Sequence, residues 1–540
     1  MRTRIRCLSI FSVAALLCGT AHAQVTPGQV EGTLRKAPEL RTPQSAPAIE
    51  KKRSPRPAGI SEGKKITVKK FVFAGNSLFD NETLQALVKD YLGHPISLAE
   101  IYDAADAVTR FYGEQGYGLA SVNVPAQKVS ARTIKLEVIE GRLSRVSTEG
   151  NERHRSETIL GFLKGVNPGA VYHGETLEHD MRLINELPGL KAKAIVSPGD
   201  QYGTSDIVIK TSEQLINGAV TIDNYGRQQL DEWRLTGQVT INNPFTIEDQ
   251  IQLLALHSDH SHLRYYYGSY GVPLNYYGTR LLLSYGRADF QVKGSPIAGY
   301  SNNTKLSVSH PLMRDFSNSL DVTAGVIRNN SNSDFAGLML SGSSITLFEI
   351  GGSYSHTYES QAVTQVSTTI DTTFSRFHTP TPGTMSHDDQ LLRWEVDAFH
   401  MQPLFERVSM LVHFDGVYSP DALADSQKFN LGGPQNVRGY PASEIRGDRG
   451  FFGSLSVTRP FICGPVTTSP RVFVESGRVY NVDYNINPPA SDSLSSAGVG
   501  TDVSYMGAIF KIDYSRTLGN HAASDGRSAS RIFGALSYAF

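Results

Sequence analysis

The sequence predicts a transmembrane β-barrel that follows two small α+β modules. Three observations predict this fold class: an N-terminal secretory signal, alternation of apolar and polar residues through 214–540, and a final strand that ends in an aromatic residue. At roughly 20 residues for each strand and its connection, the region 214–540 holds about 16 antiparallel strands.

The first 23 residues have the features of a signal peptide. A basic start precedes an apolar run over residues 7–17 and small residues up to Ala23, after which we expect cleavage. Leu17 is too bulky for the position before the modified cysteine of a lipoprotein, so Cys18 does not change this prediction. The cleaved chain keeps one cysteine, Cys463, and therefore forms no internal disulfide.

Composition excludes several classes of protein. A chain of 540 residues is too long for one ordinary domain, and a net charge of −1 argues against a nucleic-acid partner. After the signal, no apolar stretch reaches the roughly 20 residues that a transmembrane helix needs. The mean hydropathy of −0.25 is that of a soluble protein, but a transmembrane barrel is equally polar because only alternate residues meet lipid.

Residues 24–62 have the composition of a linker. They contain six prolines and a basic run at 51–53, with too few large apolar side chains to build a core. We therefore expect a disordered tether between the signal peptide and the first module.

Residues 63–141 predict the first module, in the order strand, helix, helix, strand, strand. It begins with a strand over 66–73, and Asp80 then caps a helix. Ser97 and Glu100 form a capping box for the second helix. The two remaining strands are expected at 120–124 and 134–138.

Residues 142–213 predict a second copy of this module. Gly150-Asn151 follows Gly75-Asn76 at the same point of the pattern. The expected helices lie around 159–163 and 177–184, and the expected strands around 192–196 and 207–209. Tandem recurrence of one element order indicates duplication of a small unit.

From residue 214 onward, period-2 segments replace helical periodicity. In 233–242, Trp233, Leu235 and Val239 share one face and polar residues occupy the other. The same pattern recurs in 320–326, 392–398, 408–414 and 508–514. Residues 265–267 and 276–277, all tyrosines, are expected at the membrane interface. A soluble β-sandwich or propeller is the competing architecture, but it does not require the signal peptide and the terminal aromatic residue together.

The last strand, 532–540, places Ile532, Leu536, Tyr538 and Phe540 on one face. This pattern resembles the C-terminal sorting signal of outer-membrane barrels, in which Tyr538 and Phe540 would be the recognised residues. The alternative is an ordinary buried strand at the end of the chain. Combined with the signal peptide, the pattern favours the outer membrane of a Gram-negative bacterium.

Two segments of the barrel region resemble motifs of one family. Residues 431–440 read LGGPQNVRGY, and residues 473–477 read FVESG. The first resembles the V-R-G-Y tip of the long sixth extracellular loop in the transporters of two-partner secretion, the ShlB/FhaC/HecB family. The second is similar to their F-x-D-x-G strand motif. The matching positions are Val437, Arg438, Gly439 and Tyr440 in the loop and Phe473, Glu475 and Gly477 in the strand.

Two further features extend the resemblance over nearly the whole mature chain. Residues 223–226 and 242–249 resemble the first barrel hairpin of the family, and the two modules look like its paired periplasmic POTRA domains. In some relatives an N-terminal helix plugs the barrel. Here Gly28 and Gly32 weaken the helical pattern of residues 24–35, so a tether is favoured over a plug.

The resemblance implies that the loop folds back into the lumen, where Arg438 pairs with the carboxylate of Glu475. A guanidinium in a confined lumen requires such a partner, and its planar fork suits bidentate contact. Glu475 stands where the family usually has aspartate. Because glutamate is one methylene longer, we expect the geometry of this contact to shift.

The function implied by the resemblance is export of an unfolded exoprotein. Periplasmic POTRA domains would bind it by strand addition at an exposed sheet edge, and the barrel would pass it to the cell surface without ATP. Expected partners are the exoprotein, outer-membrane lipid, the barrel-assembly machinery and periplasmic chaperones. Neither nucleic acid nor a cofactor is expected. The alternative is a barrel-assembly factor of the same superfamily, although such factors usually carry more POTRA domains. A third class, a passive porin or receptor barrel, would leave the modules and the loop motif unexplained.

An enzyme is not expected, because the chain contains no G-x-S-x-G, phosphate-binding glycine loop or zinc motif. One polar cluster comprises His257, Asp259, His260 and His262. A polar hairpin tip is favoured over a metal site there. Cys463 lies beside Gly464-Pro465 and is expected in a turn.

Overall fold

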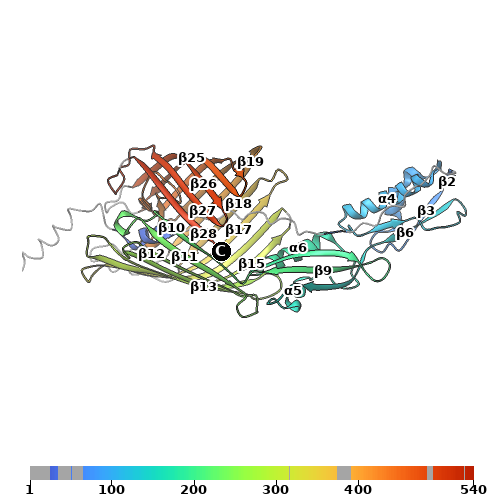
Figure 1. Cartoon of the computed structure of the whole chain (residues 1–540), viewed down its shortest axis with the longest axis horizontal. Coiled ribbons are helices and arrows are strands. Elements are labelled where there is room, and N and C mark those ends of the chain that lie inside the picture. The colour runs from blue at the N-terminus through green and yellow to red at the C-terminus, as the bar shows by residue number, and fades with distance from the viewer. Residues whose placement is uncertain are drawn as a thin grey trace, which may run out of the picture.

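The computed structural model describes residues 25–34, 50–51, 65–315, 317–373, 391–482, 490–527 and 529–540. The predicted signal peptide and most of the linker lie outside these ranges. Figure 1 shows a β-barrel with two smaller units that extend from one of its ends.

The first module packs two helices against a three-stranded sheet. Its elements are β2 (Ile66–Thr67), β3 (Lys70–Ala74), α3 (Asn81–Leu87), the 3-10 helix η1 (Lys89–Tyr91), β4 (Pro95–Ile96), α4 (Leu98–Glu114), β5 (Ser121–Asn123) and β6 (Thr133–Ile139). In the sheet, β6 pairs in parallel with β3 and antiparallel with β5. Phe71, Leu84, Val108, Tyr112 and Leu136 are fully buried between the sheet and the helices.

Both predicted helix starts of the first module are confirmed. Asp80 accepts a hydrogen bond from the N–H of Thr83 at 2.8 Å, and Ser97 and Glu100 form a complete capping box. The single strand expected over 66–73 is wrong, because the segment is divided between two partners. β2 pairs with β4 and β3 pairs with β6, with the buried Val68 between them.

The second module repeats this arrangement with α5 (Ser156–Phe162) and α6 (Gly174–Asn185) on a four-stranded sheet. The order of its strands is β1 (Glu50–Lys51), β8 (Leu190–Pro198), β9 (Thr204–Glu213) and β7 (Arg142–Glu149). Gly75 and Gly150 occupy equivalent turns with φ of +93° and +87°. A Cβ there would lie 2.3 Å from the carbonyl oxygen of Val138 and 2.6 Å from that of Thr211, so the repeated glycine is required by the turn.

Polar contacts attach the second module to turns at one end of the barrel. Arg153 donates to the carbonyl of Pro244 at 2.8 Å, and Arg314 of the barrel lies 2.6 Å from Glu186 of the module. The first module has its own core and lies beyond the second one, away from the barrel (Figure 1).

Sixteen antiparallel strands of the described residues close the barrel. They are β10 (Ile216–Asp223), β11 (Arg234–Asn242), β12 (Gln250–Ser258), β13 (Leu263–Pro273), β14 (Arg280–Gln291), β15 (Ile297–Arg314), β16 (Asn318–Phe335), β17 (Leu338–Thr357), β18 (Val363–Thr372), β19 (Leu392–Phe405), β20 (Val408–Tyr418), β23 (Arg449–Thr458), β25 (Val466–Tyr480), β26 (Ser491–Tyr505), β27 (Ala508–Thr517) and β28 (Ser530–Ala539). The first strand, β10, pairs with the last, β28, and a short β24 (Phe461–Cys463) extends the turn before β25. Cys463 is exposed and directly precedes that turn.

The strands alternate as the period-2 pattern predicts. Trp233 and Leu235 are 53% and 51% exposed on the outside, whereas Arg234 between them is buried. The expectation that all three tyrosines of 265–267 meet the membrane interface is wrong, because alternation turns Tyr265 toward an apolar cluster that includes Val30 of the N-terminal segment. No helix of the described residues is long and apolar enough to cross a membrane.

Candidate functional site in the barrel lumen

The connection between β20 and β23 forms a folded hairpin rather than an open loop. It contains the 3-10 helix η3 (Asp425–Gln427) and the paired strands β21 (Phe429–Leu431) and β22 (Ile445–Gly447). Its own apolar side chains pack with inward-facing residues of the barrel wall. The fully or almost fully buried members are Ile345, Leu347, Leu391, Phe429, Leu431, Val437, Tyr440, Phe452, Val479 and Leu494.

The tip of this hairpin, residues 432–441, has a defined backbone. Gly432 and Gly433 have φ of +106° and +107°, in the left-handed region that favours glycine. The side-chain oxygen of Asn436 accepts hydrogen bonds from the N–H groups of Gly432 and Val437, both at 2.7 Å. Hydrogen bonds within its own sequence therefore help to hold the shape of the tip.

Arg438 at the tip contacts Glu475 on β25 through both its side chain and its main chain. Its Nε lies 2.9 Å from Oε1 of Glu475, an ion-pair distance without hydrogen-bond alignment. Its main-chain N–H donates to Oε2 at 2.8 Å, and the hydroxyl of Ser496 donates to the same oxygen at 3.1 Å. Only 1% of the Glu475 side chain is exposed, so this carboxylate depends on these partners for its solvation.

Further groups of the lumen surround the Arg438 side chain. The guanidinium carbon lies 3.8 Å from the centre of the Phe473 ring, within the range of a cation–π contact. Its Nη1 lies 3.4 Å from Asp513, which also binds Arg471. The predicted loop and strand motifs are thus in contact, and Asp513 is a member of this site that the motif comparison did not identify.

The other motif residues make room for the tip or fill its core. A Cβ at Gly477 would lie 2.8 Å from Leu431 of the hairpin, and one at Gly439 would lie 2.8 Å from Ser496. Val437 and Tyr440 are fully buried. Glu475 accommodates the longer side chain because its two oxygens divide between the guanidinium and the main-chain N–H of Arg438.

Helix α2 (Pro27–Leu34) lies against the same hairpin, inside the barrel. The tether expected for these residues is wrong, because they form a helix that is held by contacts distant in the sequence. The N–H of Gly28 donates to Asp425 at 2.8 Å, and Arg234 of the barrel donates to the carbonyl of Thr33 at 3.0 Å. The glycines that weakened the helical prediction form the close-packed face: a Cβ at Gly28 would lie 2.1 Å from the carbonyl oxygen of Asp425.

The C-terminal residues lie on the outer face, as the strand pattern predicts. Tyr538 and Phe540 are 54% and 57% exposed, and the N–H of Phe540 donates to the carbonyl of Gly218 at 3.0 Å. The aromatic end of the chain therefore lies at the pairing of the first and last strands.

The residues of the histidine-rich segment 257–262 lie on different faces of the barrel wall. His257 lies outside and contacts the hydroxyl of Tyr266 at 2.8 Å. His260 and Asp259 approach the buried Asp231, a residue that the sequence comparison did not include. The Asp231 carboxylate accepts hydrogen bonds from the hydroxyl of Ser258 at 2.9 Å and from the main-chain N–H of His260 at 3.2 Å. These contacts stabilise the turn between β12 and β13.

The fold and the lumen site together define a class: an outer-membrane barrel with an inward-folded loop and α+β modules at one end. A family model described as "Haemolysin secretion/activation protein ShlB/FhaC/HecB" matches residues 203–503, more than half of the chain, and the chain belongs to this family. A model of the ShlB-type POTRA domain matches residues 66–141. The protein is an outer-membrane transporter of two-partner secretion, a family of transporters rather than enzymes.

Individual relatives agree with this assignment. The outer membrane transporter CdiB of Dickeya dadantii is 24% identical over 465 residues, which cover 82% of this chain and 81% of the relative. The solved structure of CdiB from Escherichia coli has a TM-score of 0.71 at 21% identity and covers 98% of both chains. BamA from Haemophilus ducreyi shares the fold more distantly, with a TM-score of 0.52 at 15% identity over 88% of this chain and 100% of that chain. The family model therefore favours a secretion transporter over the alternative of an assembly factor.

Proposed function

We propose that this transporter binds an unfolded exoprotein in the periplasm through its two modules and passes it through the barrel lumen to the cell surface. The second module acts in this proposal as a second POTRA domain, because it repeats the element order and the turn glycine of the first. In the first module, β3 and β5 form the edges of the sheet. Such edges bind an extended segment through main-chain hydrogen bonds with little demand on its sequence.

The observation that carries the proposal is the contact of Arg438 with Glu475. The hairpin and α2 occupy the lumen, so an exoprotein passes only after they move. Arg438 joins the tip of the hairpin to the barrel wall through the buried Glu475 carboxylate. The pair thereby holds the resting position of the hairpin, and its release accompanies export.

The remaining partners follow from the surfaces of the chain. Apolar side chains on the outside of the barrel contact outer-membrane lipid, and Tyr538 and Phe540 serve as the sorting signal for the barrel-assembly machinery. Periplasmic chaperones keep the exoprotein unfolded before it reaches the modules. The proposal involves no catalytic residue, cofactor, metal ion or nucleic acid.

We expect Arg438→Ala to reduce export of the partner exoprotein by at least about tenfold while the barrel still inserts into the membrane. Removing one member of a buried ion pair costs about 3–5 kcal/mol, which leaves the buried Glu475 without its partner and the hairpin without the defined position from which export begins. Secretion is measured by immunoblot of the culture medium, and insertion by heat-modifiable mobility of the barrel. Arg478→Ala, which removes an outward-facing arginine from β25, the strand that carries Glu475, is the matched control. Normal secretion by Arg438→Ala would contradict the proposal.

A further inference from the structure

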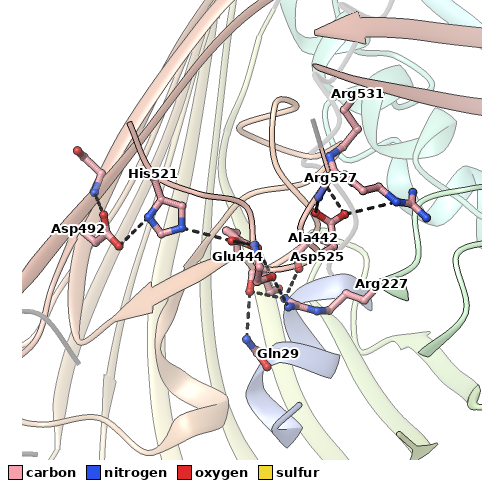
Figure 2. A network of polar contacts seen from close by, with 12 residues as sticks. Gln29, Arg227, Ala442, Glu444, Asp492, His521, Asp525, Arg527 and Arg531 are labelled. Carbon is pink, nitrogen blue, oxygen red and sulfur yellow. Dashed lines mark hydrogen bonds and ion pairs between the residues drawn. The ribbon is translucent and has the colours of Figure 1, made fainter. Parts of the chain in front are cut away.

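The hairpin has a second attachment, at the neck formed by residues 442–444 between its tip and β22. The guanidinium of Arg227, in the loop after β10, donates to the carbonyl oxygens of Ala442 at 2.6 Å and Ser443 at 2.7 Å. Arg227 is only 4% exposed, so these two carbonyls supply much of the polar contact that its charge has lost from water. Gln29 of α2 donates to the carbonyl of Ser443 at 3.4 Å (Figure 2).

Glu444, within the neck itself, binds the loop that precedes β28. Its carboxylate, 1% exposed, accepts hydrogen bonds from the N–H and the hydroxyl of Ser524, both at 2.6 Å. His521 lies 3.3 Å from the same carboxylate and 3.1 Å from Asp492 at the start of β26 (Figure 2). Ser524 and His521 both belong to the loop between β27 and β28. The neck is thus held by the loops that follow the first barrel strand and precede the last one.

The two loops are also joined to each other. Arg527 of the last loop donates to Glu232 of the first at 3.1 Å, and Arg227 of the first donates to the hydroxyl of Ser524 of the last at 3.3 Å. Within the last loop, Asp525 lies 2.8 Å from Arg531 at the start of β28 (Figure 2). The neck therefore contacts two loops that are joined to each other rather than two independent loops.

We propose that Glu444 and Arg227 are positioning residues for export, which hold the neck of the hairpin separately from the Arg438 contact at its tip. This inference rests on the proposed function, in which the hairpin leaves its resting position. The two attachments share no side chain: Arg438 binds Glu475 on the wall, whereas the neck binds the two loops. Breaking the tip contact alone therefore leaves the hairpin attached.

The histidine makes the neck attachment dependent on pH. The hydrogen bond to Glu444 raises the pKa of His521 above its ordinary value, burial opposes this shift, and Asp492 supports it. The ring of Tyr440 packs edge-on against His521 at 5.7 Å, and Arg227 interacts electrostatically with both Glu444 and Asp525. Because the folded pKa is raised, the contribution of protonated His521 is complete below its ordinary pKa near 6.5 and is lost as the pH rises through the folded value.

The test measures exposure of the neck directly. Ser443→Cys, a nearly isosteric change at a buried position, is combined with Cys463→Ser in the full chain in lipid bilayers. The rate of maleimide labelling is divided by that of the exposed Cys463 in the unchanged chain at the same pH, which cancels the pH dependence of thiol reactivity. We expect Glu444→Gln or Arg227→Lys to raise this ratio by at least about tenfold, because each leaves a buried charged or polar partner unsatisfied.

Matched controls make the same chemical changes where the side chain is exposed. Glu406→Gln in the turn after β19 and Arg478→Lys on β25 should leave the labelling ratio unchanged. The ratio should also rise between pH 6 and pH 9, with the rise absent in His521→Gln and retained in His257→Gln, whose ring lies outside the barrel.

Independence of the two attachments is tested by combining Glu444→Gln with Arg438→Ala. Separate attachments predict that the two increases in labelling multiply. Labelling of the double variant at the level of Arg438→Ala alone would overturn the proposal, as would unchanged labelling in Glu444→Gln and Arg227→Lys. Maleimide labelling reports the position of the hairpin, whereas the immunoblot of the medium reports secretion. Normal export by Arg438→Ala would therefore contradict the proposed function, and the labelling ratio alone decides whether the neck is a separate attachment.

Discussion

Glu140 lies at the junction of the two modules, with 5% of its surface exposed. One of its oxygens accepts hydrogen bonds from the N–H groups of Ser77 at 2.5 Å and Leu78 at 2.8 Å, and Arg142 lies 3.6 Å from the other. Burial raises the pKa of this carboxyl, but the hydrogen bonds from Ser77 and Leu78 outweigh it, so the net pKa is lowered. The Glu140 carboxylate thus joins the end of the first module to the turn between β3 and α3 of that module.

We expect Glu140→Gln to destabilise the first module by about 1–3 kcal/mol, because the amide keeps one oxygen for the two N–H groups but places N–H donors against the Ser77 hydroxyl and Arg142 and removes the negative charge. Hydrogen exchange at the amides of Ser77 and Leu78 in the full chain measures the loss. Glu114→Gln, at an exposed position on α4, is the control. In the unchanged chain the contribution of Glu140 is present above its ordinary pKa near 4.3 and is lost as the pH falls through the lowered value. Equal protection in both variants would show that this carboxylate is dispensable.

At the scale of elements, the stability of α2 depends on its surroundings. It has eight residues, too few for a stable isolated helix in water, and two of them are glycine. Its position is set by the hydrogen bond from Gly28 to Asp425 and by apolar contacts of Val30 inside the barrel. The glycine face allows the helix to approach the backbone of η3 closely.

We expect Gly28→Ala to displace α2 from the hairpin and to increase the conductance of the barrel in planar bilayers. The new Cβ would lie 2.1 Å from a backbone oxygen of Asp425, which cannot yield as a side chain would. Gly113→Ala in α4 is the control: its Cβ would meet nothing within 4 Å, and alanine favours a helix over glycine by about 1 kcal/mol. Conductance unchanged by Gly28→Ala would mean that the helix tolerates the methyl group in place.

At the scale of the whole molecule, the two modules differ in their relation to the barrel. The second is attached to barrel turns through Arg153 and Glu186, whereas the first lies beyond it with its own core. A protein that approaches this end of the barrel would therefore meet the first module before the second one.

We expect deletion of residues 66–141 to reduce export strongly while the barrel and the second module stay folded. The deletion removes the edges of β3 and β5 that the proposed function uses to bind an extended segment, and it leaves the contacts of Arg153 in place. Secretion is compared with heat-modifiable mobility of the barrel. Unimpaired export would mean that the first module acts only as a spacer.

Much of the fold could be predicted because its causes are local. The capping box of Ser97 and Glu100 and the turn glycines Gly75 and Gly150 act within a few residues of their own position. Alternation along the strands reports which side chains face out, as Trp233 and Leu235 show. The division of the strand over 66–73 was missed because its two partners, β4 and β6, lie elsewhere in the chain.

The candidate site divides in the same way. The motifs of Arg438 and Glu475 were recognisable because each is a short run of characteristic residues. Arg227, Glu444 and His521 carry no such signal, since each is an ordinary loop residue and the contacts between the neck and the two loops join residues 77 or more positions apart.

The sequence by itself therefore determined the barrel and the duplicated modules, and its resemblance to the family predicted the inward contact of the loop motif. Period-2 alternation, helix caps and short motifs encode these features within a few residues. Only the tertiary structure decided that α2 lies in the lumen and that the neck is held by the first and last loops. Inside a barrel, the polar residues of a strand face either water or another segment of the chain. The alternation of apolar and polar residues along the strand is the same in both cases, so it does not report which segments fill the lumen.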